Sequence, residues 1–386
     1  MESTTEAAAD RRSDETVSKG KDKDPKTKSP PRTKTPPDVS EVKPTTQQHQ
    51  SPPEAEIETD DTATIEVDSR HNYDSASDAG YGTDEAGSTA STSISSSIRD
   101  YAFENNRRYH KYQEGRYQFP NDEPEQERED MKHSMIVNLC DGRLHFAPLH
   151  NPQRILDVGT GTGIWATDMG DEYPEADVQG IDLSPIQPQW VPPNVHFILD
   201  DAEAEWVYPE NSLDYIHLRH MTSSIRDWPL LVSRAYEALA PGGWIEMQEL
   251  MFDLRCDDDS VRPGNMVAGF FDNMKKGLES FGVDLLAMRK NQQFLLDAGF
   301  IHVQEVPRKV PVGVWPKGQK MKTIGLYNRS MIYDALSGVS IKPFKHGLKW
   351  PQEEIELYLV GVRKDLMDSS QHGYIPFHVV IGQKPE

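Results

Sequence analysis

Short apolar runs alternate with segments of helical periodicity between residues 154 and 250. The runs have the length of buried strands, and the segments between them carry apolar residues three or four positions apart. The pattern predicts strands over Ile155–Val158, a run ending at Asp182, Val195–Leu199, Leu213–Leu218 and Trp244–Leu250. Because strands that alternate with helices usually lie parallel and are joined by right-handed crossovers, we expect an α/β fold built on a parallel sheet.

The pattern is less regular after residue 250. It predicts two helices, a strand, two further helices and a last strand, over Met266–Phe281, Leu285–Ala298, Ile301–Val306, Met321–Leu336, Pro351–Met367 and Tyr374–Ile381. In the last of these helices, Ile355, Leu359 and Val362 recur at helical spacing, which is first of all the pattern of a core-facing stripe. The helices between the two strands are therefore open to two interpretations, a substrate lid or a scaffold.

The first hundred residues lack this patterning. Residues 1–100 contain no Leu, Phe, Trp or Cys and are rich in Ser, Thr, Pro and charged residues. Such a segment cannot bury enough apolar surface to offset the entropy of ordering it, so we predict a disordered tail over residues 1–100. A basic stretch between Lys19 and Lys34 is either a nuclear address or part of a flexible linker.

The folded part of the chain is expected to begin near Tyr101, and residues 101–150 are predicted to form a helical N-terminal segment. Asn121 or Asp122 offers an N-cap for a helix over Glu123–Leu139, and Pro124 suits its first turn. Because this segment directly precedes the sheet, it could cover a binding cleft or pack against the edge of the core. The sequence leaves both possibilities open.

Charge and cysteine content narrow the classes of protein. The 386-residue chain has a formal net charge of −22, which does not suit binding to a nucleic acid backbone. It has two cysteines and no C-x-x-C or His/Cys cluster, so no disulfide framework and no metal site are expected. No apolar run approaches the length of a membrane span, and the N-terminus has no signal-peptide pattern. We therefore expect an intracellular protein of the cytoplasm or nucleus, without nucleic acid or membrane as a partner.

The first predicted strand leads directly into a glycine-rich turn. Residues 154–165 read R-I-L-D-V-G-T-G-T-G-I-W, with Gly159, Gly161 and Gly163 at alternate positions. Glycine lets the backbone turn sharply and lets a ligand approach the main chain closely. A dinucleotide fingerprint would need Gly or Ala where the chain has Ile164, and a P-loop would need Lys followed by Ser or Thr. What fits is an acid, Asp157, two residues before G-x-G-x-G, which resembles motif I of the class I S-adenosylmethionine-dependent methyltransferases.

S-adenosyl-L-methionine carries a cationic sulfur, so acids around its pocket make electrostatic sense. Asp157 is predicted to fix the glycine turn and to bind the ammonium of the methionine part. Asp182, about 20 residues past the turn, is predicted to accept the ribose hydroxyls. After the next strand, Asp201 and Ala202 are predicted to meet the adenine, and Asp200 is expected to be a turn residue.

Methyl transfer depends mainly on geometry and on the exclusion of water, so no fixed catalytic triad is expected. His217 and His220 lie at the end of the strand over Leu213–Leu218, at the edge where open α/β sheets bind ligands. Either could be a general base for a hydroxyl substrate, or a structural histidine. Glu246 and Glu249 lie on the following strand, and the one that reaches the cleft depends on the register.

Several separated motifs carry a family resemblance. They are D-V-G-T-G-T-G-I-W from Asp157, G-I-D-L-S-P-I-Q-P from Gly180 and P-G-G-W-I-E-M-Q-E from Pro241. Together with G-R-Y-Q-F-P-N-D from Gly115 and K-W-P from Lys349, they resemble the LaeA-type methyltransferases of fungi, which are akin to trans-aconitate methyltransferases. The resemblance covers about residues 101–385.

The resemblance implies a Rossmann-like class I methyltransferase sheet over residues 151–386, with a C-terminal antiparallel pair and a helical insertion over about residues 311–372. It also implies S-adenosyl-L-methionine as cofactor and a role in fungal secondary metabolism. The chain would methylate a small-molecule acceptor or act as a methylating regulator of biosynthetic clusters. The alternative is a cofactor-binding nuclear regulatory subunit that works through velvet-type protein partners without needing catalysis.

Overall fold

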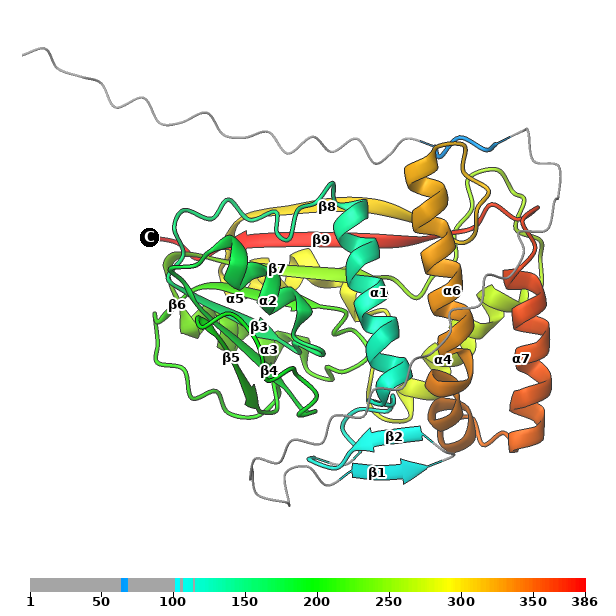
Figure 1. Ribbon diagram of the computed structural model, residues 1–386, viewed down its shortest axis with the longest axis horizontal. Helices are drawn as coiled ribbons and strands as arrows, with labels where there is room; N and C mark the ends of the chain where they lie inside the picture. Colours follow the sequence, from blue (N-terminus) through cyan, green and yellow to red (C-terminus); the bar gives the residue numbers. More distant parts are fainter. Residues whose placement is uncertain (1–63, 69–100, 105–106, 114) are drawn as a thin grey trace, which may run out of the picture. The chain divides into compact units, whose positions relative to one another are not determined.

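A seven-stranded sheet runs through the computed structural model, which describes residues 64–68, 101–104, 107–113 and 115–386 (Figure 1). The order of the strands is β5-β4-β3-β6-β7-β9-β8. Their bounds are β3 (Arg154–Val158), β4 (Asp177–Asp182), β5 (Val195–Leu199), β6 (Leu213–Arg219), β7 (Leu239–Leu250), β8 (Ile301–Pro311) and β9 (Tyr374–Gln383). β3 to β7 pair in parallel, whereas β9 is antiparallel to both β7 and β8. The predicted α/β sheet with its C-terminal antiparallel pair is confirmed.

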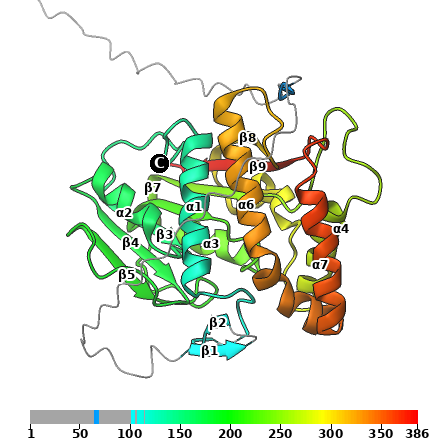
Figure 2. The same ribbon diagram turned by 45° about the vertical axis from the view of Figure 1, so that its right-hand side comes forward.

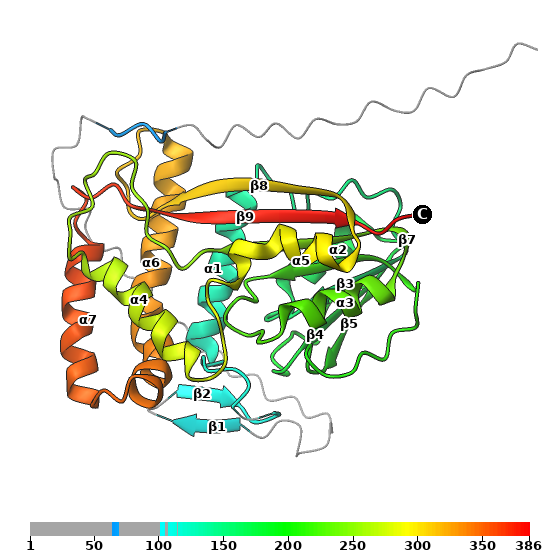
Figure 3. The same ribbon diagram turned by 180° about the vertical axis from the view of Figure 1, so that it is seen from behind.

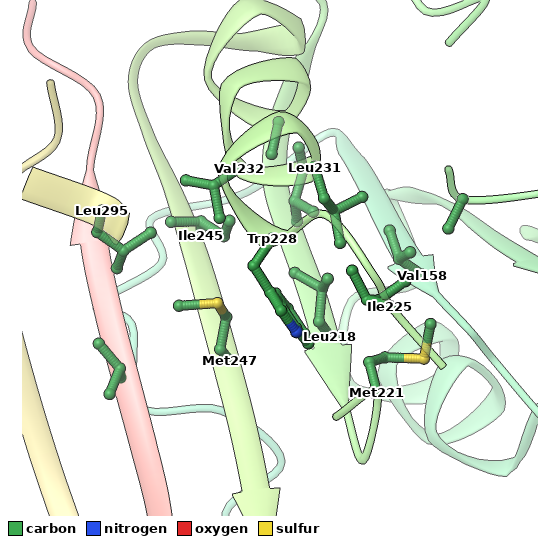
Figure 4. Close-up of a cluster of buried hydrophobic side chains, with 14 of the residues drawn as sticks. Val158, Leu218, Met221, Ile225, Trp228, Leu231, Val232, Ile245, Met247 and Leu295 are labelled. Atoms are coloured by element: carbon green, nitrogen blue, oxygen red, sulfur yellow. The ribbon is translucent and has the colours of Figure 1, made fainter. Parts of the chain in front are cut away.

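Helices cover both faces of this sheet. α1 (Glu123–Leu139), α2 (Ile164–Glu172) and α6 (Gln319–Lys342) share one buried cluster with the sheet. On the opposite face, visible in Figure 3, lie α3 (Trp228–Ala238) and α5 (Asn291–Ala298), the second preceded by the short helix η1 (Ala287–Lys290). Figure 4 shows how this second core forms, with Trp228 and Leu231 of α3 packed against Leu218 and Met247 of the sheet.

A third core lies among the helices beyond the sheet. α4 (Met266–Glu279), α7 (Gln352–Leu366) and the second half of α6 enclose it, and the short helix η2 (Pro343–Gly347) joins α6 to α7. Ile355, Leu359 and Val362 of α7 are fully buried there, so α7 is scaffold, as the stripe indicated. α6 has a different place, side by side with α1 (Figure 2).

The predicted element bounds are close to the observed ones. α1 begins and ends where expected, and Asp122 caps it by accepting the backbone N–H of Glu125 at 3.3 Å. Gly299 ends α5 in a left-handed conformation. The structure differs from the prediction at two elements. The helix expected over Leu285–Ala298 is split into η1 and α5, and β8 continues past Val306 because an edge strand tolerates prolines.

An antiparallel hairpin precedes α1 and was not predicted. β1 (Tyr101–Glu104) pairs with β2 (Arg107–His110), so residues 101–150 are not purely helical. The hairpin is held to α1 by Arg107, whose guanidinium contacts the N-cap carboxylate of Asp122 at 2.5 and 2.7 Å. Arg108 lies over the ring of Tyr101 at 4.6 Å. These tertiary contacts stabilise a strand pair that has no alternating apolar pattern.

A short segment of the N-terminal tail contacts the insertion. Val67 forms an antiparallel bridge with Pro316, and the N–H of Asp68 donates to the carbonyl of Trp315 at 3.0 Å. Lys317 and Lys322 form ion pairs with Glu66 and Asp68. Residues 64–68 therefore differ from the predicted disorder.

The rest of the predicted tail, including the basic stretch between Lys19 and Lys34, lies outside the described residues. Within the described part, no helix combines the length and apolar content needed to cross a membrane. No group of three or more His, Cys, Asp or Glu side chains in that part could hold a metal ion.

Candidate active site

The glycine turn between β3 and α2 contains three residues with positive φ, at +73° for Gly159, +59° for Gly161 and +81° for Gly163. All three conformations favour glycine. A Cβ on Gly159 would collide with the Met221 side chain, and one on Gly163 would collide with the ring of Phe197. A Cβ on Gly161 would have no atom within 4 Å. Two of the glycines thus permit packing, and Gly161 is the one whose backbone faces open space.

Asp157 fixes the glycine turn, as predicted from its position. It is buried, and its carboxylate accepts the Thr160 hydroxyl at 2.6 Å and pairs with Nδ1 of His217 at 2.8 Å. Thr160 lies inside the turn, so this bond couples the end of β3 to the loop. The two carboxylate oxygens are thus both engaged within the protein.

Asp182 closes the turn from the neighbouring strand. Its carboxylate accepts the backbone N–H of Gly161 at 2.9 Å and that of Ser184 at 2.8 Å. Burial raises its pKa to about 6, even though these two hydrogen bonds lower it. Each oxygen keeps a further lone pair for a ligand hydroxyl.

Asp201 is also buried and is tied to the N-terminal segment. Its carboxylate accepts the N–H of Glu203 at 2.9 Å and lies 3.1 Å from the guanidinium of Arg116. Arg116 also reaches Glu203 at 3.3 Å. Asp200 accepts the N–H of Asp201 at 2.8 Å, which agrees with the turn role expected for it.

Several of these residues, among them Gly161, Asp182 and Asp201, line one cavity of about 260 Å³. One side, which we call the polar wall, is formed at the carboxyl ends of the strands by Gly159, Gly161, Asp182, Asp201 and Ala202. The other side, the apolar wall, is formed by residues of α4 and α6, namely Phe270, Phe271, Met274, Met331, Ile332 and Ala335. Residues 116–121 of the N-terminal segment also line the cavity, so this segment covers the cleft while the far side of α1 packs in the core. α6 also lines the cavity, as a substrate lid would, and that role stays a prediction.

A charged stripe on α1 was missed by the sequence interpretation. Glu125, Arg128, Glu129 and Lys132 recur at helical spacing and line the cavity. Arg128 contacts both glutamates, and Lys132 contacts Glu129 at 2.6 Å. Burial raises the pKa of Glu129, but Arg128 and Lys132 lower it to about 2. In a sequence, a charged stripe on a helix indicates a solvent-exposed face. Only the packing of α1 in the structure shows that this stripe lines a cavity.

Arg219 at the end of β6 was not predicted either. It donates to Nδ1 of His133 at 2.8 Å, and Nε2 of His133 lies 2.9 Å from Asp168. Because Arg219 can only donate, His133 must carry its proton on Nε2. No carboxylate of the described residues lies within ion-pair distance of Arg219, and burial lowers the pKa of its guanidinium. It lines both the main cavity and a second one of about 50 Å³.

The two candidate histidines lie in different environments. His217 is fully buried and stacks on Trp165 with 3.6 Å between ring centroids, and it lines only the smaller cavity. Burial lowers its pKa even though Asp157 raises it. These contacts favour a structural or ligand-binding role for His217 over that of a base facing an acceptor.

His220 lines both cavities and has a strained backbone, with φ at +58°. Its Nε2 is buried and has no hydrogen-bond partner among the residues described. Burial, followed by the charges of Lys132 and Arg219, holds its pKa well below the ordinary value. The imidazole is therefore neutral near pH 7 and has a lone pair available.

The register of β7 separates the two glutamates. Glu249 lines the cavity and accepts the N–H of Met221 and the hydroxyl of Thr222, both at 2.7 Å. Glu246 lies outside the cavity lining and accepts the N–H groups of Phe146 and Ala147 at 2.8 and 2.9 Å. Burial raises the pKa of Glu249 to about 7. Glu249 holds the loop that carries His220, and Glu246 is structural.

Known proteins resemble this chain in sequence. Residues 131–295 match a family model described as a methyltransferase domain. The chain is 39% identical over 296 residues to methyltransferase pytC of Aspergillus terreus, covering 76% of this chain and 91% of the relative. It is 33% identical over 285 residues to the protein-methionine methyltransferase laeA of Emericella nidulans, covering 73% and 76% of the two chains. Among solved structures, phosphoethanolamine N-methyltransferase 2 of Haemonchus contortus is 20% identical with a TM-score of 0.40, over 66% of this chain and 53% of that one. On its sequence, this chain belongs to the family of fungal methyltransferases that includes pytC and laeA.

Proposed function

We propose that the chain binds S-adenosyl-L-methionine against the polar wall and methylates a small molecule of fungal secondary metabolism. The observation that carries the proposal is Gly161, whose backbone borders open space beside the partly buried carboxylate of Asp182. This arrangement suits a ligand that approaches the main chain closely and has hydroxyl groups that donate to a carboxylate. The bound cofactor would supply an electrophilic methyl group.

The residues of the polar wall have chemistry that suits each part of this cofactor. Asp182 would accept the ribose hydroxyls, and Asp201 with Ala202 would border the adenine. The smaller cavity suits the amino-acid part. Asp157 and Glu129 would neutralise its ammonium, and Arg219, which lacks a carboxylate partner among the described residues, would bind its carboxylate.

His220 is the residue we assign to proton removal from the acceptor. It lies where both cavities meet, and its imidazole is neutral and has no partner on Nε2 among the described residues. Glu249 positions it by binding the next two residues of the loop. His217 would instead support the cofactor side, because Asp157 and Trp165 hold it in the wall of the smaller cavity.

A metabolite acceptor is supported by two features. The cavity is covered by residues 116–121 and α6, which favours a small ligand over a folded protein segment. The relative pytC is named as a methyltransferase. The second candidate, a regulator of biosynthetic clusters acting through velvet-type partners, is supported by relatives named as secondary metabolism regulators, at 34–36% identity.

Calorimetry with S-adenosyl-L-methionine tests the cofactor assignment. Asp182→Ala removes a charge-assisted hydrogen-bond acceptor and should weaken binding by roughly ten- to a hundred-fold, equivalent to about 1.5–3 kcal/mol. Gly161→Val places a side chain in the open space and should do the same. A folded Asp182→Ala protein with the affinity of the wild type would overturn the assignment.

Two matched variants separate ligand contact from strain. Gly142 also has a positive φ, at +84°, with no atom within 4 Å of a Cβ, but it does not line either cavity. Gly142→Val therefore carries a similar backbone cost and should leave cofactor affinity unchanged. Asp177 begins the same strand that Asp182 ends and is exposed, so Asp177→Ala is the control for the carboxylate.

A further inference from the structure

The apolar wall differs from the polar wall in the kind of side chain it offers. Phe270 and Phe271 of α4 lie edge to face, with 6.1 Å between their centroids, and Phe271 meets Phe252 in the same way. Met331 and Ala335 of α6 continue the wall. An aromatic and methionine surface of this kind favours a flat apolar ring as its ligand.

Away from the polar wall, most of the charges that border the main cavity are paired within the protein. Arg128 is paired with two glutamates, and Lys132 is paired with one of them. Glu249 is engaged by the loop after β6. Arg219 lacks a carboxylate partner among the described residues, and it also lines the smaller cavity, beside the glycine turn. An ionic acceptor resting on the apolar wall would therefore lose its hydration without gaining a counter-charge.

One polar group is built into the apolar wall. Asn328 of α6 is almost fully buried and lines the cavity. Its Nδ2 donates to the carbonyl of Pro311 at 2.9 Å, which sets the orientation of the amide. The Oδ1 of the same amide is an acceptor that can take a hydrogen bond from a ligand hydroxyl or amine.

We infer that the apolar wall is the binding site of the methyl acceptor, and that the acceptor is an uncharged ring compound with a hydroxyl or amine donor. The inference rests on the proposed function, because it assigns the second half of the same cavity. Ring packing would supply most of the binding free energy, and Asn328 would orient the ring.

Two fluorescent probes of the same ring size test the charge preference. 2-Naphthol is neutral at pH 7, and 2-naphthoate is an anion. The full chain is titrated with each probe in the presence and absence of saturating S-adenosylhomocysteine, which would occupy the polar wall. We expect saturable binding of 2-naphthol, at least about tenfold tighter than that of 2-naphthoate. Equal affinities, or a preference for the anion, would overturn the inference.

Variants of α6 test the location. Ala335→Leu fills the wall without adding a polar group and should weaken 2-naphthol binding by about tenfold or more. Leu326→Phe also adds apolar volume to α6, but on its exposed face, and should leave the probe affinity unchanged. Unchanged 2-naphthol affinity in a folded Ala335→Leu protein would place the probe elsewhere and overturn the inference.

Calorimetry with S-adenosyl-L-methionine on the same proteins separates a failure of the proposed function from a failure of the acceptor assignment. Ala335→Leu should bind S-adenosyl-L-methionine with an affinity within about twofold of the wild type. If the wild type binds no cofactor, the proposed function fails, and the naphthol titrations still decide whether the apolar wall is a ring-binding site. If cofactor binds normally and neither probe does, only the acceptor assignment fails.

Discussion

The polar wall and the apolar wall line one cavity but are built in different ways. The polar wall consists of a few residues at the ends of adjacent strands, between Gly159 and Ala202, and it uses backbone groups and carboxylates. The apolar wall draws on α4 and α6, between Phe270 and Ala335, and offers mainly side-chain shape, with the amide of Asn328 as its polar group. The first arrangement suits a ligand that is the same throughout a family, and the second suits a ligand that can change whenever helices repack. The following predictions test this division, from the largest expected effect to the smallest.

The largest effect is expected on the rate of methyl transfer, when the proposed general base is removed. His220→Ala should reduce the rate of methyl transfer by roughly 10²–10⁴-fold, because a general base is lost, and cofactor affinity should stay within about twofold. The measurement is the ratio of unmethylated precursor to methylated product in a deletion strain complemented with each variant, together with cluster transcripts. His196→Ala, on the exposed part of β5, is the control.

The same strains distinguish enzyme from regulator. A pathway enzyme predicts one accumulating precursor with unchanged transcripts in both the His220→Ala and the Asp182→Ala strains. A methylating regulator predicts falling transcripts instead. Full rescue of both readouts by a variant shown not to bind cofactor would leave a scaffold role as the remaining explanation.

The second effect concerns the stability of the third core, among the helices beyond the sheet. Leu359→Ala on α7 removes a fully buried side chain and should lower the free energy of unfolding by about 2–5 kcal/mol. Leu357 lies on the same helix but is 75% exposed, so Leu357→Ala should change it by less than about 0.5 kcal/mol. Denaturant titrations measure both. Because the third core does not contribute to the polar wall, cofactor affinity should be unchanged, and a large loss of affinity in Leu359→Ala would show that the two walls are coupled.

The third effect is a pH dependence of the polar wall. Burial raises the pKa of Asp182 to about 6. For folding alone, a raised carboxyl pKa stabilises the protein at low pH, and this contribution is lost as the pH rises through 6. Cofactor binding has the opposite sign, because the ionised carboxylate is the better acceptor of ribose hydroxyls. The affinity should therefore be about tenfold weaker at pH 5 than at pH 7.

Calorimetry at the two pH values measures this shift. Asp182→Asn should bind weakly and lose most of the pH dependence. Glu249, whose pKa is raised to about 7, titrates in the same range, so Glu249→Gln is the control and should retain the dependence. A pH-independent affinity in the wild type would argue against a ribose contact by Asp182.

The smallest effect concerns the tail. The composition of residues 1–98 predicts that their removal leaves the melting temperature within a few degrees. Residues 64–68 add two ion pairs to the insertion, at Lys317 and Lys322, and surface ion pairs of this kind contribute little to stability. A chain lacking residues 1–70 should therefore melt slightly below one lacking residues 1–60, by about 1–4 °C. Identical melts would show that the 64–68 contact is not stabilising, and a much larger drop would show further packing of the tail.

Much of the polar wall could be predicted from the sequence because its chemistry depends on near neighbours. The glycine turn, Asp157 and Asp182 follow directly from strand ends, whose spacing along the chain determines where the side chains lie. The choice between His217 and His220 could not be made in this way. Both lie at the end of β6, and what separates them is the stack on Trp165 and the bond to Asp157, from other elements.

The sequence by itself determined the α/β class, the strand order along the chain and the ends of helices such as α1 and α5, because hydrophobic periodicity and capping act over a few residues. Only the tertiary structure decided which glutamate of β7 meets the cavity, that the charged stripe of α1 is enclosed, and that residues 101–110 form a hairpin. It also decided the composition of the apolar wall. These features arise from contacts between segments far apart in the chain, and such contacts depend on the summed packing of many side chains, not on any local pattern.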